Sequence, residues 1–303
     1  MADTPEDALV VETPADVRTV ADEVVKGNCI LFVGAGVHSH ASEESTIDLP
    51  MLGGELSKYI AGETGYAEDY PKDQVTNLAR VSLYAEHKQG FGRPWLIRAI
   101  RENVQTGKKP SPMLETLAGL PFRYIATTNY DNFFEQCLFQ KKKNPQVVVY
   151  NPDRNVPTDD YIGDEPGDDP TADRPFFLKM HGHIDKPESM VITDEDYIQF
   201  VLRMGDSEGF HPVPRSFHLA FSRLCTIFVG YSLLDYNLRL LFKTLRWGVQ
   251  PARQPKTYSI DPYPDHIIQK VYPNIQFIVR DVWSFVPMLQ SELARRHKKE
   301  NVA

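Results

Sequence analysis

Seven short runs of apolar residues recur along the chain, and most stretches between them show the spacing of amphipathic helices. A run that is apolar at every position, such as CILFV at 29–33, is typical of a strand buried on both faces of a parallel sheet. Strands that alternate with helices indicate an α/β fold with a mainly parallel sheet. We expect the strands at residues 29–33, 124–127, 147–150, 176–180, 226–230, 257–260 and 275–279.

Neither an internal repeat nor a second folding unit is visible, so we expect residues 1–303 to form a single domain. Valines at helical spacing predict a first helix, with Thr13 as its N-cap and Pro14 in its first turn. The segment 151–175 departs from this pattern because Asp, Pro and Gly dominate it. A segment of this composition buries little apolar surface, so we expect an exposed, mobile loop inserted into the domain.

The charge balance argues against a protein that coats nucleic acid. Lysine and arginine number 33 against 41 acidic residues, a net charge of −8, whereas nonspecific DNA binding needs a basic surface. The N-terminus has no apolar signal core, and no run approaches the ~18 apolar residues of a membrane span. We therefore expect a cytoplasmic protein with no membrane contact. The three cysteines, Cys29, Cys137 and Cys225, form no C-x-x-C pair, so no zinc module or other metal site is expected.

Glycines and histidines stand where two of the predicted strands end, which is the side of an open parallel sheet that binds ligands. Gly34-Ala35-Gly36 follows the strand at 29–33. Small residues there would let backbone N–H groups approach a diphosphate, although a tight structural turn explains them equally well. His181-Gly182-His183 ends the strand at 176–180. One of these imidazoles is either a base at the mouth of the sheet or a half-solvated residue that terminates the strand.

Two further strand ends carry polar side chains. Thr128, Asn129 and Asp131 follow the strand at 124–127. The amide of Asn129 can both donate and accept, which suits a ribose hydroxyl or a water molecule, but Asn129 also fits a plain turn. Asp131 can equally cap the helix that follows it. The last end is Gly230, after which Ser232 can reach a phosphate.

These four ends together, "GAG", "TTNYD", "KMHGHID" and "FVGYSLLD" in that order, resemble the sirtuin-like NAD-binding family, and most of all its branch from bacterial antiphage systems. The resemblance covers roughly residues 18–285 and implies a Rossmann-like sheet, with helices on both faces and NAD across the strand ends. It implies catalytic roles for Asn129 and His181, whereas His183 has no counterpart and is expected to be structural or to support a residue that contacts the substrate. It also implies NAD contacts for Gly34, Ala35, Gly36, Thr128, Asp131, Gly230 and Ser232.

The departures from the family pattern favour hydrolysis of NAD. Protein-deacylating sirtuins carry a four-cysteine zinc module, which three scattered cysteines cannot build. Their "GIPDFR" segment is replaced by Leu49-Pro50-Met51-Leu52-Gly53, so the phenylalanine that is thought to keep water from the reactive sugar carbon is missing. We therefore expect an NAD hydrolase. The alternatives are a deacylase or ADP-ribosyltransferase, a non-catalytic NAD or ADP-ribose sensor, and a nucleic-acid-associated scaffold, against which the acidic composition counts.

The expected reaction yields nicotinamide and ADP-ribose, with Asn129 holding the ribose and positioning water. His181 would accept a proton, for which an ordinary imidazole pKa of about 6.5 is suited. An unrestrained NAD hydrolase would drain its own cell, so we expect activity to be conditional. The resemblance to antiphage systems implies an effector subunit of an abortive-infection complex. We expect a homo-oligomer switched on by a separately encoded partner, with a HerA-type ATPase as first choice and a short argonaute system as second.

Overall fold

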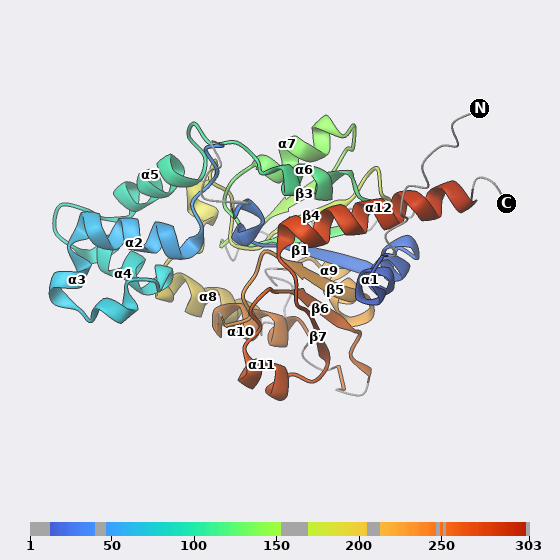
Figure 1. Cartoon of the computed structure of the whole chain (residues 1–303). Helices are drawn as coiled ribbons and strands as arrows, with labels where there is room; N and C mark the ends of the chain where they lie inside the picture. Colours follow the sequence, from blue (N-terminus) through green and yellow to red (C-terminus); the bar gives the residue numbers. More distant parts are fainter. Residues whose placement is uncertain are drawn as a thin grey trace, which may run out of the picture.

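A sheet of seven parallel strands forms the centre of the described part of the chain (Figure 1). This computed structural model describes residues 13–39, 47–152, 169–204, 213–234, 236–246, 249–250 and 253–300. The strand order is β3-β4-β2-β1-β5-β6-β7. The strands are β1 (Cys29–Val33), β2 (Tyr124–Thr127), β3 (Gln146–Val149), β4 (Phe176–Lys179), β5 (Cys225–Val229), β6 (Thr257–Ile260) and β7 (Ile275–Ile278).

The predicted strands are confirmed to within one residue at each end, and the parallel α/β architecture is confirmed with them. β1 and β5 are buried at every position, as their apolar sequences require. Successive side chains of a strand point to opposite faces of the sheet. In β1, Leu31 and Val33 therefore join the apolar core on one face, while Ile30 and Phe32 join the core on the other.

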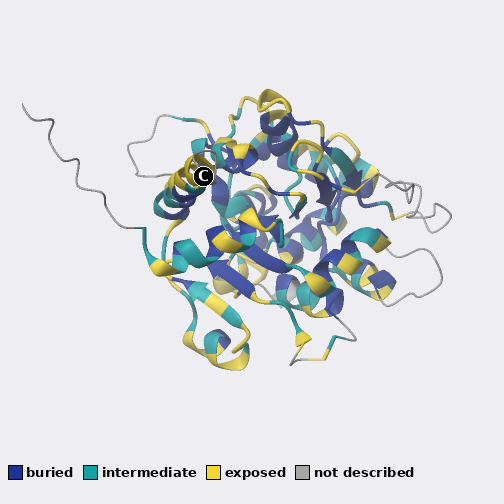
Figure 2. Cartoon of the chain, turned by 90° about the vertical axis from the view of Figure 1, so that its right-hand side faces the viewer, coloured by how far each residue is buried: buried dark blue, intermediate teal, exposed yellow. Residues whose placement is uncertain are grey.

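Helices cover both faces of the sheet, so the buried residues concentrate at the centre of the molecule (Figure 2). The core on one face includes residues of α1 (Ala15–Val25), α6 (Pro112–Gly119), α7 (Phe133–Gln140) and α12 (Val282–Glu300). The core on the other face includes residues of α8 (Asp194–Met204), α9 (Arg215–Arg223), α10 (Tyr236–Leu245) and α11 (His266–Val271). No helix among the described residues is long and apolar enough to cross a membrane.

A group of helices between β1 and β2 has an apolar core of its own, which the sequence analysis did not distinguish. The group comprises α2 (Gly53–Thr64), α3 (Tyr66–Asp69), α4 (Leu78–His87) and α5 (Arg93–Val104). It lies to one side of the sheet, at the left in Figure 1. Leu56, Ile60, Val81, Leu96 and Ile100 are buried in its core, together with Ile184 and Ile192 from the chain that follows β4. This helical group therefore packs directly on the segment that follows the turn His181-Gly182-His183, which we call the HGH turn.

One expectation from the sequence is wrong, and another falls largely outside the described residues. The assignment of Thr13 as N-cap is wrong, because α1 begins at Ala15 with Pro14 in the N-cap position and without a side-chain cap. Thr13 instead hydrogen-bonds Glu292 of α12. The acidic loop expected over 151–175 lies largely outside the described residues, which omit 153–168.

The three cysteines are free thiols buried in the core. Cys29 and Cys225 are partners in the β1–β5 register, and Cys137 lies on α7. The hydrogen bond with the neighbouring Cys225 thiol and, after it, burial raise the pKa of Cys29, so it stays protonated.

Candidate active site

The direction of the chain across the sheet reverses at β1 and β5, since β2 lies on the far side of β1 and β6 on the far side of β5. Crevices at such a reversal, outside the carboxyl ends of the strands, are where open α/β sheets bind ligands. A cavity of about 910 Å³ lies here. Its volume is near the upper end of the range for small-molecule sites, which is about 300–1,000 Å³.

Eight of the nine residues singled out from the sequence line this one cavity. They are Ala35, Gly36, Thr128, Asn129, Asp131, His181, Gly230 and Ser232. Four strand ends that are far apart in the sequence therefore meet at one place. The ninth, Gly34, lies behind the lining and packs against the turn that follows β5.

The glycines at the ends of β1 and β5 allow two turns to touch. A Cβ on Gly36 would lie 2.8 Å from the carbonyl oxygen of Gly230, and one on Gly230 would lie 2.3 Å from the Val37 nitrogen. Gly34 and Gly36 donate their N–H groups to the carbonyls of Val229 and Gly230, each at 2.9 Å. Both N–H groups are thus used inside the protein. The close contact of the two turns explains why glycine is needed here, as the alternative of a tight structural turn predicted. Contact of these glycines with NAD stays a prediction.

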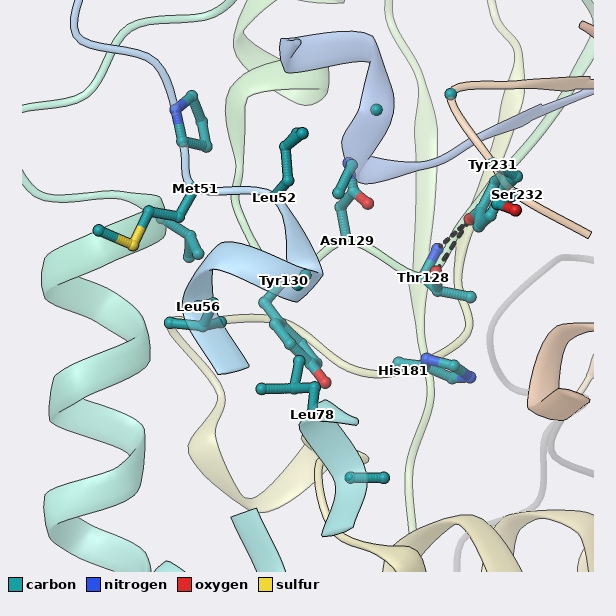
Figure 3. A pocket seen from close by; sticks show the side chains of 18 of the residues that line it. Met51, Leu52, Leu56, Leu78, Thr128, Asn129, Tyr130, His181, Tyr231 and Ser232 are labelled. Atoms are coloured by element: carbon teal, nitrogen blue, oxygen red, sulfur yellow. Dashed lines mark hydrogen bonds between the residues drawn. The ribbon is translucent and has the colours of Figure 1, made fainter. Parts of the chain in front are cut away.

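Tyr231 joins three strand ends at the floor of the cavity (Figure 3). Its hydroxyl donates to the carbonyl of Val33 at 2.9 Å and accepts the N–H of Thr128 at 3.1 Å. It also lies 2.9 Å from the Thr128 hydroxyl. One phenol therefore holds the ends of β1 and β2 against the turn after β5.

Asn129 follows β2 and faces the cavity with its side chain uncommitted. Its backbone N–H donates to the Thr127 hydroxyl at 3.0 Å, which fixes the turn. Thr127 in turn donates to the Val33 carbonyl at 2.6 Å. The Asn129 amide makes no hydrogen bond to any described residue, so both its donor and its acceptor are available to a ligand.

His181 follows β4 and is 5% exposed, although it lines the same cavity. Its ring packs edge-on against Tyr197 and Phe200, with centroids 4.9 and 5.6 Å away. Nδ1 lies 3.3 Å from the Tyr197 hydroxyl, whereas Nε2 has no hydrogen-bond partner among the described residues. Burial lowers the pKa of His181 to about 3. The expectation of an ordinary imidazole pKa is therefore wrong for the free protein, in which the ring is neutral at physiological pH.

Apolar side chains form the wall of the cavity opposite the strand ends. Met51, Leu52, Leu56, Leu78 and Tyr130 gather there in Figure 3. Pro50 and Gly53, from the segment that replaces the deacylase "GIPDFR" pattern, also line the cavity. That segment is thus part of the site, and the side chains that it contributes to the lining are apolar.

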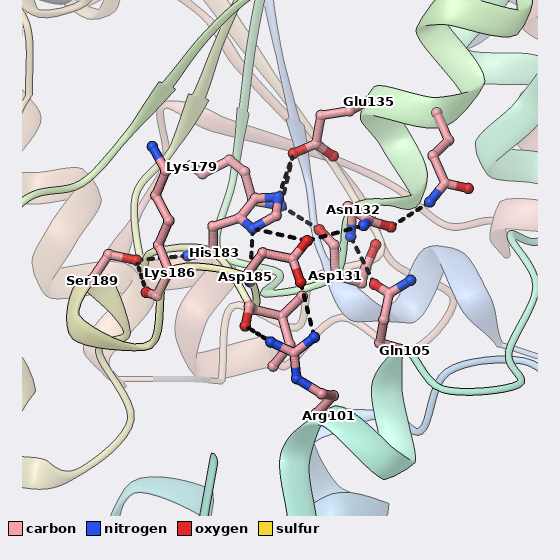
Figure 4. A network of polar contacts seen from close by, with 12 residues as sticks. Arg101, Gln105, Asp131, Asn132, Glu135, Lys179, His183, Asp185, Lys186 and Ser189 are labelled. Atoms are coloured by element: carbon pink, nitrogen blue, oxygen red, sulfur yellow. Dashed lines mark hydrogen bonds and ion pairs between the residues drawn. The ribbon is translucent and has the colours of Figure 1, made fainter. Parts of the chain in front are cut away.

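His183 lies outside the lining of the cavity and belongs to a network of polar contacts (Figure 4). Its Nε2 is 3.4 Å from a carboxylate oxygen of Glu135, and its Nδ1 accepts the Asp185 N–H at 2.9 Å. Arg101 of α5 contacts the Asp185 carboxylate at 2.9 Å and also donates to the Ile184 carbonyl. The network ties the HGH turn to α7 and to the helical group.

A buried ion pair lies at the centre of this network. Lys179, the last residue of β4, is completely buried, and its Nζ is 3.1 Å from Glu135. Lys179 also donates to the carbonyl of Asp131. Burial alone would raise the pKa of Glu135, but the Lys179 charge and the bond from His183 hold it below its ordinary value. The pair therefore fixes the chain after β2 to the chain after β4.

Comparison with known proteins assigns the family. The model of the SIR2-like domain matches residues 123–278, just over half of the chain. The chain belongs to the SIR2-like family. The match includes Asn129, His181 and Gly230, while the Gly34-Ala35-Gly36 turn lies before it.

Three curated relatives of this SIR2-like chain carry names that refer to NAD+ hydrolysis or to defence. NAD(+) hydrolase ThsA of Enterococcus faecium is 27% identical, covering 79% of the chain and 44% of that protein. Defense-associated sirtuin 2 of Bacillus subtilis is 20% identical, covering 82% and 22%. NAD(+) hydrolase ThsA of Acinetobacter baumannii (strain 532279) is 21% identical, covering 93% and 56%. The chain thus spans about half or less of the length of these relatives.

The cavity residues that sequence reasoning missed include Tyr231 and His38. Tyr231 follows Gly230 directly, so its place beside the strand end was a signal that could have been used. His38 lies in the short 3-10 helix η1 (Ala35–His38) after the glycine turn, where only the bend of the chain returns it to the cavity. Among the described residues, no group of three His, Cys, Asp or Glu side chains is placed to hold a metal ion.

Proposed function

We propose that this chain hydrolyses NAD+ to nicotinamide and ADP-ribose. The observation that carries the proposal is the meeting of Asn129 and His181 in one cavity at the switch point of the sheet. They come from the ends of neighbouring parallel strands, and each presents an uncommitted polar atom. The name NAD(+) hydrolase, which several relatives carry, supports the same chemistry.

The reaction breaks the bond between the ribose C1′ and the pyridinium nitrogen, and the electron pair leaves with neutral nicotinamide. A water oxygen bonds to C1′ and loses one proton. Because the leaving group is a neutral pyridine, the transition state is an oxocarbenium-like sugar that needs little acid catalysis and no metal. The site must hold the ribose, orient the water and remove a proton.

Asn129 is proposed to hold the ribose and orient the attacking water, since its amide can do both at once. His181 is proposed to accept a hydrogen bond, through its unpartnered Nε2, from a ribose hydroxyl or the water. Its low pKa makes the imidazole a weak base in the free protein, so proton transfer to it depends on charge that develops in the bound state. Because the His181 imidazole is neutral at pH 7, it keeps a lone pair that can accept a hydrogen bond.

The remaining lining residues are assigned to the rest of the dinucleotide. Ala35, Gly230 and Ser232 surround the junction of β1 and β5, where we place the diphosphate. Thr128 stays beside them through its bonds to Tyr231. Asp131 is assigned to the carboxamide end.

We further propose that the chain is the effector of an antiviral defence complex and acts as a single catalytic domain in a homo-oligomer. A separately encoded partner would activate it, a HerA-type ATPase by first choice and a short argonaute system by second. The support is the family and its relative named Defense-associated sirtuin 2. Conditional activity requires two states that a partner can bias, which a packed interface between copies supplies.

Incubation with etheno-NAD+, with and without each candidate partner, tests the proposal by the rise of fluorescence on cleavage. Chromatography of a parallel reaction with NAD+ should find nicotinamide and ADP-ribose in equal amounts. Release that depends on an acylated peptide, or label transferred to protein, would contradict hydrolysis. Tight binding of NAD+ without turnover under every condition would identify a sensor instead.

A further inference from the structure

Tyr197 of α8 lines the cavity and makes a polar contact with His181 that the proposed function leaves without a role. Its hydroxyl lies 3.3 Å from His181 Nδ1, and the two rings meet edge-on with centroids 4.9 Å apart. Among the described residues, this hydroxyl is the one group that hydrogen-bonds the imidazole ring, since Nε2 has no partner there. The contact therefore decides how the proton of His181 is placed.

Backbone bonds at the start of α8 hold Tyr197 beside His181. The Val191 N–H donates to the carbonyl of His181 at 3.1 Å, so the segment that leads into α8 is attached to His181 itself. The carboxylate of Asp196 accepts the N–H of Thr193 at 3.0 Å and fixes the first turn of the helix. Tyr197 then donates its own N–H to the Thr193 carbonyl at 3.0 Å. The phenol is thus placed by the surrounding backbone as well as by the imidazole.

A neutral imidazole carries one N–H and one lone pair, and its two tautomers differ in what His181 can do. With the proton on Nε2, the lone pair lies on Nδ1, and the ring cannot accept a hydrogen bond from a ribose hydroxyl or a water molecule in the cavity. With the proton on Nδ1, the Nε2 lone pair is available. The partner of one ring nitrogen sets which nitrogen is protonated. An oxygen that accepts the Nδ1–H therefore selects the useful tautomer.

We propose that Tyr197 is a positioning residue whose hydroxyl oxygen accepts the Nδ1–H of His181 and so keeps the Nε2 lone pair available to the substrate. The inference rests on the proposed function. When Nε2 takes a proton from a ribose hydroxyl or the water, the ring becomes cationic, and the bond from Nδ1–H becomes charge-assisted and about twice as strong. Tyr197 itself neither gives nor takes a proton in this step. The 3.3 Å separation is slightly long, as catalytic hydrogen bonds of free enzymes often are before substrate binds.

The first test reads the tautomer of His181 from the chemical shifts of its two ring nitrogens, in isotope-labelled protein at neutral pH. The His181 resonances are assigned by their loss in His181→Gln. We expect the wild-type protein to carry the proton on Nδ1. Tyr197→Phe removes the acceptor and should move the proton largely to Nε2, the form that an unrestrained histidine side chain favours. Tyr130→Phe removes another hydroxyl of the cavity, one that donates to the Val191 carbonyl at 2.7 Å, and should leave the tautomer unchanged.

The second test measures cleavage of etheno-NAD+ with the partner that activates the chain. Tyr197→Phe should lower kcat by about tenfold, which is the value of one hydrogen bond in the transition state. KM should stay nearly the same, because Tyr197 acts through His181 and not through contact with the substrate. A residue that only supported the fold would lower stability without this change in kcat and without a change of tautomer.

The outcomes separate the inference from the proposed function. A wild-type protein with the proton on Nε2 of His181, or a folded Tyr197→Phe variant with an unchanged tautomer, would overturn the inference. An equal change in Tyr130→Phe, or a raised KM with unchanged kcat in Tyr197→Phe, would overturn it as well. If Tyr197→Phe does not fold, the tautomer of the wild-type protein decides. Absence of NAD+ cleavage by the wild-type protein under every condition would contradict the proposed function, whatever the tautomer.

Discussion

The two histidines of the HGH turn are separated only by Gly182 but lie in opposite surroundings. His181 lines the cavity among aromatic rings, and its Nε2 has no partner among the described residues. His183 lies on the other side of the turn, where Glu135 and the Asp185 N–H occupy its two nitrogens. Gly182 allows this divergence, since its φ is +86° and a Cβ there would lie 2.2 Å from the Ser189 carbonyl oxygen.

The contrast between the two histidines distinguishes a ligand site from a structural network. Leaving a buried polar atom without a hydrogen bond costs about 1–3 kcal/mol, so a protein that satisfies one imidazole and not its neighbour has a reason. The side of His183, where ion pairs hold Glu135, joins β4 to α7 and α5. His181 lines the cavity in which we place the substrate. The predictions that follow test this division.

The largest expected effect is on NAD+ cleavage. His181→Gln and Asn129→Ala should each reduce kcat/KM by about a thousandfold or more, which is about 4 kcal/mol of transition-state stabilisation. Both lie at strand ends, so their unfolding free energies at neutral pH should change little. His183→Gln is the matched control and should keep measurable turnover. Turnover near the wild-type value in either site variant would remove that residue from the mechanism.

The buried ion pair should give the largest change in stability. Lys179→Met leaves Glu135 buried without its partner and should lower the unfolding free energy by about 3–5 kcal/mol, measured by chemical denaturation. Lys141→Met, at an exposed lysine just after α7, should change it by less than about 0.5 kcal/mol. Equal stability of the two variants would show that the network of His183 is not structural.

Acid should destabilise the protein through its neutral, buried imidazoles. Burial lowers the pKa of His181 to about 3, while the unfolded chain has its ordinary value near 6.5. Between these values the unfolded state binds the proton and the folded state does not, so stability falls as the pH falls. His181 accounts for about 2 kcal/mol between pH 6.5 and 5, and His38, with its pKa lowered too, acts in the same direction.

His181→Gln should therefore lose less stability than the wild-type protein on going from pH 6.5 to pH 5, measured by denaturant titration. Identical losses in the two proteins would mean that His181 is not held neutral by the fold.

The smallest effect is expected at the Tyr231 hydroxyl, which, like the His183 ring, is bonded within the protein. Tyr231→Phe removes its bonds to Val33 and Thr128 and should cost about 1 kcal/mol of unfolding free energy. Tyr263→Phe, at a residue 88% exposed, should cost nothing measurable. If the two variants unfold alike, Tyr231 does not hold the strand ends together.

Much of the fold was predictable because its signals are local. Wholly apolar runs such as Cys29–Val33 gave the strands, and the polar residues after them marked the edge where ligands bind. The helical group between β1 and β2 was missed because the apolar residues of its helices have the same spacing as those of the helices that cover the sheet. Only packing shows that these helices form a separate core. The pKa of His181 was out of reach for a similar reason, since it depends on Tyr197 and Phe200 from a later helix.

The account is tested most directly by NMR of the histidine side chains during titration with NAD+. Isotope-labelled imidazole resonances can be assigned from His181→Gln and His183→Gln, and the measurement needs no turnover. We expect saturating NAD+ to shift the His181 resonances strongly and to leave those of His183 nearly in place. Shifts at His183 with none at His181, or no shift at either, would contradict a substrate site on the cavity side of the turn.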